Sequence, residues 1–139
     1  MKILVINGPN LNLLGSRAPQ TYGRDTLGNI IAELEEAGKK IGIDVDAFQT
    51  NHEGKIIDKL HEARGLYDGV IINPGAYTHY SYAIRDAIEA IGIPVVEVHL
   101  SNIYSREDFR HTSVISPVCR GTVAGFGKKG YFLALESFL

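Results

Sequence analysis

Short runs of apolar and β-branched residues recur along the chain, and three of them, at residues 2–6, 69–73 and 94–98, are nearly continuous. Such runs are typical of strands buried on both faces, as in a parallel sheet covered by helices. The second run is weaker and alternates between apolar and polar residues, which favours an edge strand. In chain order, the five predicted strands cover residues 2–6, 45–48, 69–73, 94–98 and 121–126.

Between these strands, apolar residues recur at spacings of three and four, the pattern of amphipathic helices. Asp25 or Thr26 is suited to cap the first helix, and Gly42 follows its end. The apolar stripes span residues 27–41, 56–63 and 83–91, and residues 128–138 can supply a short final helix. This alternation predicts a flavodoxin-like, doubly wound α/β fold, in which a five-stranded parallel sheet has helices on both faces. One domain is expected to cover residues 1–139.

The composition of the 139-residue chain is that of an ordinary globular protein, with 45% hydrophobic and 22% charged residues. A formal net charge of -2, with scattered Lys and Arg, argues against nucleic acid or an anionic membrane surface as a partner. The N-terminus does not resemble a signal peptide and no apolar run is long enough to cross a bilayer, so a cytoplasmic location is expected. The single cysteine, Cys119, excludes an internal disulfide and a cysteine-based zinc site.

Amide, imidazole and charged side chains follow three of the predicted strands, where a plain connection needs only turn residues. They lie in residues 7–24, 73–79 and 97–102. In doubly wound sheets, ligands bind at the carboxyl ends of the strands, close to the point where the strand order reverses. The topology therefore predicts that these three segments form one site.

Glu97 and His99 are two residues apart on a strand, so their side chains share a face. A carboxylate late in a buried strand is costly unless it is paired, and His99 is its natural partner. The pairing would fix the tautomer of the imidazole and raise its basicity. The alternative is a Glu–His pair that merely caps the strand end.

Arg17 and Tyr22 lie in a segment of about fifteen residues without a helix or strand pattern, and long loops of this kind tend to be lids or binding loops. A free tyrosine has a pKa near 10, so a tyrosine base at neutral pH needs a neighbouring cation. Arg17 is near enough in sequence to provide it. Spacing alone does not separate this reading from an exposed tyrosine on a mobile loop.

The remaining polar residues of the three segments have both functional and ordinary interpretations. Asparagine side chains can hold a water or an enolate oxygen, but asparagine is also a common turn residue. His79 is expected to open the third helix, and Arg110 can bind an anion or face solvent. Asp86 lies off the apolar stripe of that helix, so it faces solvent or another subunit. The asparagines concerned are Asn10, Asn12 and Asn73.

Several well-known motifs are absent from the expected positions. No Gly-x-Gly-x-x-Gly follows the first strand, and Pro9 removes an N–H that a phosphate cradle would use, which argues against a nicotinamide enzyme. Gly-x-Ser-x-Gly is missing, so a serine hydrolase is disfavoured. The lysines avoid the strand ends, which weighs against Schiff-base chemistry. Cys119 has no evident base beside it in sequence and is expected to be inert.

Long strings of residues in the same segments resemble the type II 3-dehydroquinases, in order and over nearly the whole chain. They are NGPNLNLLG with the following Arg17 and Tyr22-Gly23, INPGAYTH at 72–79, AIRDA at 83–87, EVHLSNI at 97–103 and REDFRH at 106–111. The resemblance implies a cofactor-free and metal-free lyase that converts 3-dehydroquinate to 3-dehydroshikimate in the shikimate pathway of aromatic amino acid biosynthesis. It also implies a homo-oligomer of trimers grouped into a dodecamer.

The same resemblance assigns roles by position. Tyr22 would be the base, kept ionised by Arg17, and His99 the general acid, oriented by Glu97, with Asn10 assisting. The substrate carboxylate would lie on Asn73, Leu100 and Ser101, the last two partly through backbone N–H groups. The ring hydroxyls would be held by His79 and Arg110, and Asp86 would reach into a neighbouring subunit's site.

Two other functions stay open on the sequence. A non-catalytic flavodoxin-like module that binds a small polar acid would need Asn73, Ser101 and Arg110 but not the Arg17–Tyr22 pair. A flavin electron carrier is the second, and a colourless purified protein would dismiss it. The sequence does not distinguish a biosynthetic enzyme from one that degrades quinate, because both catalyse the same reaction.

Overall fold

The structure, a computed structural model, describes residues 1–16, 20 and 24–139. Arg17 and Tyr22, the predicted base and its cationic partner, therefore lie outside the described residues. The strands are β1 (Lys2–Asn7), β2 (Asp44–Gln49), β3 (Gly69–Asn73), β4 (Val95–His99) and β5 (Gly121–Ala124). The helices are α2 (Leu27–Lys40), α3 (Glu53–Ala63), α4 (Tyr82–Ile91) and α5 (Lys129–Glu136).

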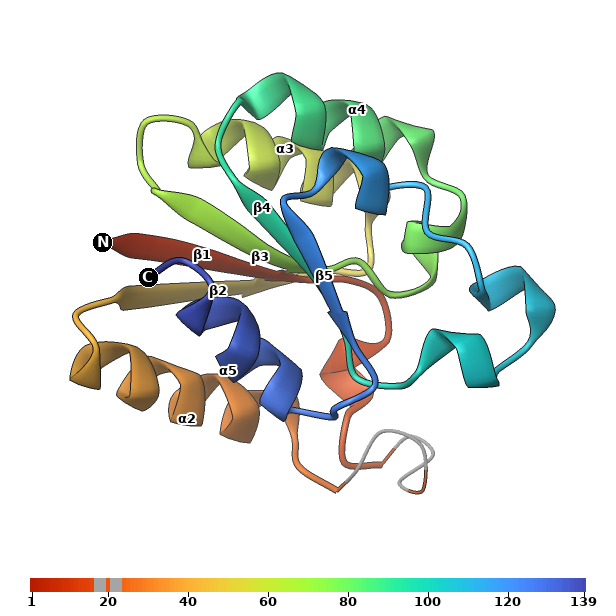
Figure 1. The fold of residues 1–139 in the computed structure, drawn as a ribbon, viewed down its shortest axis with the longest axis horizontal. Helices are drawn as coiled ribbons and strands as arrows, with labels where there is room; N and C mark the ends of the chain where they lie inside the picture. The colour runs from red at the N-terminus through yellow and green to blue at the C-terminus, as the bar shows by residue number, and fades with distance from the viewer. Residues whose placement is uncertain (17–19, 21–23) are drawn as a thin grey trace.

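The five strands form one sheet in the order β2-β1-β3-β4-β5, and every neighbouring pair is parallel. Figure 1 shows α3 and α4 covering one face of the sheet and α2 and α5 covering the other. The predicted doubly wound sheet is confirmed, with β2 as an edge strand. The strand order reverses beside β1, so the point between the ends of β1 and β3 is where such a fold binds its ligand.

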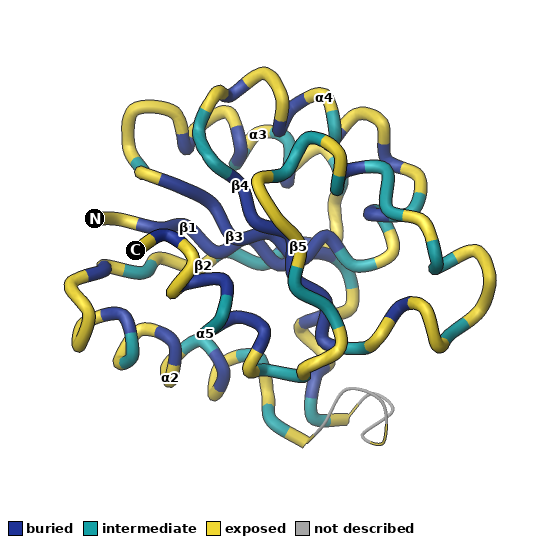
Figure 2. Tube along the Cα trace, viewed as in Figure 1, coloured by how far each residue is buried: buried dark blue, intermediate teal, exposed yellow. Residues whose placement is uncertain are grey.

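The alternation of side chains along β1 divides the core into two halves. Ile3 and Val5 pack with α2 and α5, whereas Leu4 and Ile6 pack with α3 and α4. The central strands are buried along their whole length, as the dark segments in Figure 2 show. This two-sided burial explains why the central strands are nearly continuous apolar runs, with polar residues only toward their carboxyl ends.

Local capping sets the ends of the helices. The side chain of Thr26, rather than Asp25, caps α2 by accepting a hydrogen bond from the N–H of Asn29. Gly92 ends α4 in the left-handed conformation, which a glycine adopts without strain. Among the helices that the structure describes, none is both long and apolar enough to span a membrane.

Candidate active site

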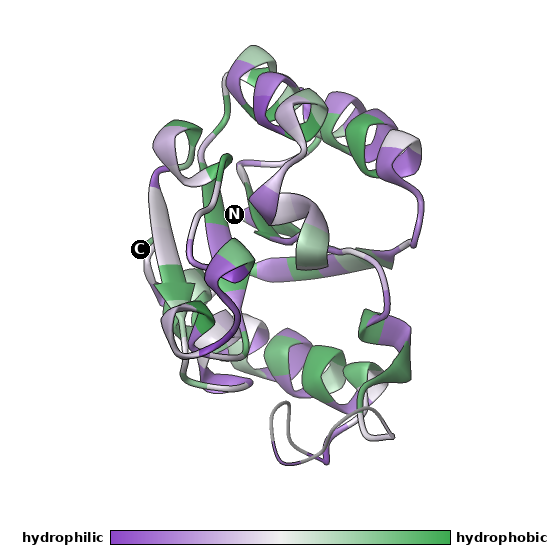
Figure 3. Cartoon of the chain, turned by 90° about the vertical axis from the view of Figure 1, so that its right-hand side faces the viewer, coloured by the Kyte–Doolittle hydropathy of each residue, from purple (hydrophilic) through white to green (hydrophobic). Residues whose placement is uncertain are grey.

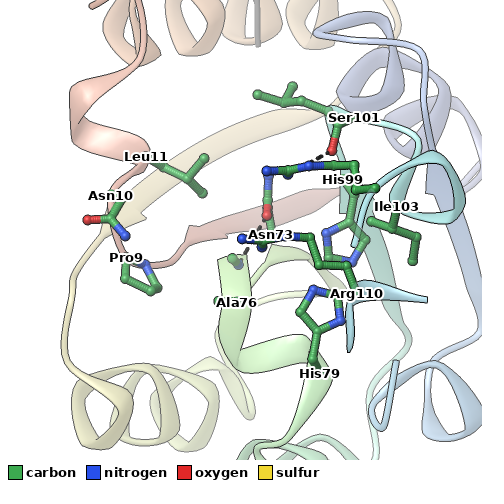
Figure 4. Close-up of a pocket in the computed structure, with 13 residues that line it drawn as sticks. Pro9, Asn10, Leu11, Asn73, Ala76, His79, His99, Ser101, Ile103 and Arg110 are labelled. Carbon is green, nitrogen blue, oxygen red and sulfur yellow. Dashed lines mark hydrogen bonds between the residues drawn. The ribbon is translucent and has the colours of Figure 1, made fainter. Parts of the chain in front are cut away.

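A pocket opens where the strands end. Figure 3 shows the backbone of the molecule from the right-hand side of Figure 1, coloured by hydropathy. The lining of the pocket comes from the loop after β1, the 3₁₀ turn after β3 and the chain that follows β4. Seven of the predicted site residues line it, namely Asn10, Asn73, His79, His99, Leu100, Ser101 and Arg110. Figure 4 shows His79, His99 and Arg110 gathered on one side of the pocket and Asn10 on the other.

Close contact between two backbone segments forms the floor of this pocket. Asn7 and Asn73 are partners in the β1–β3 register, and the N–H of Gly8 donates to the carbonyl of Asn73 over 2.7 Å. A Cβ atom on Gly8 would lie 2.6 Å from the carbonyl carbon and oxygen of Pro74. Only glycine permits this approach, so the loops after β1 and β3 are held together as one unit.

Asn10 has a left-handed backbone conformation, with φ 70°, which asparagine tolerates better than most residues. Its N–H donates to Oδ1 of Asn51 over 3.1 Å. The side chain of Asn10 is thereby left at the pocket wall. Asn12, by contrast, accepts a hydrogen bond from Gln49 outside the pocket, which agrees with the turn interpretation.

Asn73 is buried, and its side-chain amide is fixed by two hydrogen bonds. Its Oδ1 accepts from the N–H of Gly75 over 3.2 Å, and its Nδ2 donates to the hydroxyl of Tyr131 over 3.1 Å. Tyr131 in turn donates to Oδ1 of Asn7. Among the described residues, the second N–H of Asn73 has no acceptor and is left for a ligand, in an orientation that the buried network determines.

Glu97 and His99 form the predicted pair at the end of β4. Nε2 of His99 donates to Oε2 of Glu97 over 2.5 Å, while Glu97 is fully buried and His99 is 6% exposed. Burial alone would raise the pKa of the Glu97 carboxyl, but hydrogen bonds from His99, Ser116 and Thr78 hold that pKa below its usual value. Within the described residues, no hydrogen bond involves Nδ1 of His99, so Nδ1 is the ring atom left to exchange a proton.

His79 lies beside His99, with the ring centroids 6.5 Å apart and the planes nearly parallel. The prediction that it opens the third helix is wrong: it ends the 3₁₀ turn Gly75–His79, because Ser81 caps α4 two residues later through the N–H of Ile84. Nδ1 of His79 faces the carbonyl of Thr112 at 2.8 Å. Burial lowers the pKa of His79, so at neutral pH its Nε2 is an acceptor.

The chain after β4 brings two guanidinium groups to the pocket. Arg110 donates to Glu107 over 3.0 Å and also lies over the ring of Phe109. Arg106 donates to the hydroxyl of Ser101 over 3.3 Å. Sequence reasoning missed Arg106 as a pocket residue, because a cation in a charged loop has no periodicity that reveals its direction.

Backbone donors are also available beside His99. Among the described residues, no backbone hydrogen bond outside the helices and strands takes the N–H of Leu100 or Ser101. Asp86, on the other hand, is exposed on α4 and does not line the pocket. Within the described ranges, no group of three His, Cys, Asp or Glu side chains is placed to hold a metal ion.

Comparisons with known proteins point in one direction. The family model described as Dehydroquinase class II matches residues 1–139. The 3-dehydroquinate dehydratase of Bacillus mycoides (strain KBAB4) is 57% identical over 138 residues, which are 99% of this chain and 94% of that protein. The 3-dehydroquinate dehydratase of Bacillus cytotoxicus is 55% identical with the same coverage.

Solved structures agree with the sequence comparison. The type II dehydroquinase from Butyrivibrio crossotus superimposes with a TM-score of 0.97 at 52% identity, covering 99% of this chain and 96% of that one. The type II dehydroquinase from Propionibacterium acnes gives a TM-score of 0.95 at 47% identity, covering 99% and 94%.

Proposed function

Because this chain belongs to the class II dehydroquinase family and is a 3-dehydroquinate dehydratase, a hydro-lyase, we propose how its strand-end pocket removes water from the substrate. The observation that carries the proposal is the buried Glu97–His99 pair. Nδ1 of His99 has no partner among the described residues. A general acid of this kind is what expulsion of a hydroxyl group requires.

The reaction proceeds in two steps through an enolate. Tyr22 removes a proton from C2, next to the C3 ketone of 3-dehydroquinate, and the electron pair moves onto the ketone oxygen. The enolate then expels the C1 hydroxyl, which takes the proton from Nδ1 of His99 and leaves as water. The product is the conjugated enone 3-dehydroshikimate. Neither step requires a redox cofactor or a metal ion.

Arg17 lowers the pKa of the Tyr22 phenol so that the phenolate is available near neutral pH. A decrease of about three units corresponds to a preference for the phenolate of roughly 4 kcal/mol, which a neighbouring guanidinium can largely supply. Both residues lie outside the described part of the chain, so their roles rest on the sequence and on the family pattern. Asn10 assists by positioning His99 or the water that donates a hydrogen bond to the enolate.

The other pocket residues bind and orient the substrate. The substrate carboxylate accepts hydrogen bonds from the remaining N–H of Asn73 and from the backbone N–H groups of Leu100 and Ser101. The absence of other acceptors for these donors among the described residues supports this assignment. The neutral Nε2 of His79 accepts a hydrogen bond from a ring hydroxyl. Arg110 donates to a neighbouring hydroxyl.

The direct test is to mix the purified protein with 3-dehydroquinate and follow the ultraviolet absorbance of the enone. We expect rapid turnover that falls by about 10²–10⁴-fold in both Tyr22→Phe and His99→Ala, as expected for loss of a general base or acid. A folded Tyr22→Phe variant that turns over as fast as the unchanged protein would refute the role of Tyr22. Ligand binding without turnover in the unchanged protein would favour the binding module.

We also propose that the enzyme works in the cytoplasm, in the shikimate pathway, as a homo-oligomer of trimers grouped into a dodecamer. Exposure of Asp86 on α4 is consistent with a contact in the neighbouring subunit's site. Light scattering should then give the mass of twelve chains, and Asp86→Ala should raise KM without affecting the fold. A monomer with full activity would refute the assembly and the role of Asp86 together.

A further inference from the structure

The carboxylate of Glu97 receives more hydrogen bonds than its pairing with His99 requires. Four hydroxyl groups, which we call the hydroxyl cage, surround it. Thr78 donates to Oε2 over 2.6 Å, Ser116 donates to Oε1 over 2.5 Å, and Ser113 lies within 3.0 Å of both oxygens. Thr122 is the most distant member, 3.5 Å from Oε1. Thr78 lies in the 3₁₀ turn after β3, Ser113 and Ser116 lie in the loop before β5, and Thr122 lies on β5. Their convergence from three segments is a built feature.

The proton between Glu97 and His99 has two possible positions. When it resides on Nε2 and the ring is doubly protonated, the pair is a carboxylate and an imidazolium, and Nδ1–H is a good acid. When it resides on Glu97, the ring is neutral and its Nδ1–H is a very poor acid. Burial favours this second, neutral arrangement, because both charges lose their hydration.

The hydroxyl cage opposes that effect of burial. Hydroxyl donors stabilise the charged form of a carboxyl group and not its neutral form. A neutral Glu97 would accept hydrogen bonds from these hydroxyls more weakly, in a place where Thr78 is fully buried. The cage therefore determines which of the two groups holds the proton.

We propose that Thr78, Ser113 and Ser116 are positioning residues that keep the negative charge on Glu97, so that His99 acts as an imidazolium acid through Nδ1. This inference rests on the proposed function, in which His99 is the acid. It adds three residues that never touch the substrate and that tune the acid through Glu97.

The other titratable or charged groups near the Glu97–His99 pair do not stabilise the Glu97 carboxylate by hydrogen bonds. The ring of His79 is 6.5 Å from that of His99, centroid to centroid, and Arg110 lines the same pocket. Burial, with a smaller effect of the Glu97 charge, raises the pKa of Cys119 to about 12, so that thiol stays neutral. None of the three donates a hydrogen bond to Glu97 among the interactions of the described residues.

The test compares Thr78→Val and Ser116→Ala, alone and combined, with Thr122→Val as the matched control. Thr78→Val preserves shape and removes only the hydroxyl. Thr122→Val makes the same change at the 3.5 Å position and should have the least effect. The assembled enzyme is labelled with nitrogen-15 histidine for solid-state NMR, and the His99 signals are identified by their loss in His99→Gln.

In the unchanged enzyme we expect Nε2 of His99 to be protonated. In the double variant, part of that signal should move to the position of an unprotonated nitrogen. The plateau of kcat should fall about tenfold, less than the roughly 10²–10⁴-fold expected for complete loss of the general acid, and its alkaline limb should move to higher pH. Thr78→Ser keeps the hydroxyl, so a variant that carries it in place of Thr78→Val should recover the Nε2 signal and the kinetic profile.

An unchanged Nε2 signal and an unchanged alkaline limb in folded double variants would overturn the inference, even if the variants melt earlier. If Ser116→Ala does not fold, Ser116→Cys, a weak donor of similar size, replaces it. The NMR result does not depend on turnover. A His99→Ala variant that keeps its activity would refute His99 as the general acid. The Nε2 signal of His99 would still show whether Glu97 carries the negative charge.

Discussion

The hydroxyl of Tyr131 accepts a hydrogen bond from Nδ2 of Asn73 over 3.1 Å and so joins the C-terminal helix α5 to the floor of the pocket. The two residues are 58 positions apart in the sequence, and both are buried. Burial raises the pKa of Tyr131 well above its usual value, so its hydroxyl remains neutral and donates to Asn7. Tyr131, which does not itself line the pocket, therefore orients a residue that is proposed to bind the substrate carboxylate.

Replacement of Tyr131 by Phe should weaken both stability and substrate binding. The variant leaves buried groups of Asn73 and Asn7 without a partner, at an expected cost of about 1–3 kcal/mol. KM for 3-dehydroquinate should rise more than kcat falls, because Asn73 would lose its fixed orientation. Urea unfolding at constant protein concentration and steady-state kinetics measure the two effects.

The control for this variant is Tyr67→Phe, which removes a hydrogen bond to Asp46 at an exposed position. Water can replace that bond, so the loss of stability should be smaller and KM should not change. Equal losses in the two variants would contradict a special role for Tyr131.

Much of the fold followed from the sequence because parallel strands buried on both faces leave an unmistakable pattern. The run Gly69–Asn73 matches β3 residue for residue, and the spacing of Glu97 and His99 gave their pairing because side chains on a strand repeat every two residues. Arg106 and the hydroxyls of Ser113 and Ser116 could not be found in this way. They lie in irregular segments, where only the folded backbone determines which way a side chain points.

The close approach of the loops after β1 and β3 predicts the effect of Gly8→Ala. The added Cβ would meet the backbone of Pro74 at 2.6 Å, which no side-chain rotation relieves. We expect a loss of about 1–3 kcal/mol of stability and a strong fall in activity, because the floor of the pocket must shift. Gly54→Ala is the control: its Cβ would meet nothing within 4 Å, and alanine favours helix α3. A stable, active Gly8→Ala variant would show that the loops can separate.

The depressed pKa of Glu97 predicts how stability depends on pH. The folded-state pKa lies below the unfolded value of about 4.3, so the ionised carboxylate stabilises the fold above that pH, and this contribution is lost as the pH falls through the folded pKa. Glu97→Gln should cost about 1–3 kcal/mol at pH 7, and the difference from the unchanged protein should shrink below about pH 4. Melting temperatures measured from pH 3 to pH 8 test this. A difference that grows in acid would mean that Glu97 is protonated in the fold.

Cys119 should be unreactive in the folded protein. Burial raises the pKa of its thiol to about 12, against about 8.5 for a free cysteine, so the thiolate fraction at pH 8 is lower on the order of 10³-fold. Alkylation by iodoacetamide should therefore be slow in buffer and fast in urea, as measured by mass spectrometry. Rapid native labelling that abolishes activity would instead place a reactive thiol near the site.

The arrangement of donors around Glu97 also has a consequence for the order of folding. Three of the four hydroxyls of the cage, those of Ser113, Ser116 and Thr122, follow β4 in the chain, so they reach the carboxylate only when the segment after β4, which ends in the edge strand β5, has folded against it. A partly folded species without that edge would bury an anion with too few donors, which is costly. Such intermediates should be scarcely populated, and the edge strand should fold and unfold cooperatively with the centre of the sheet.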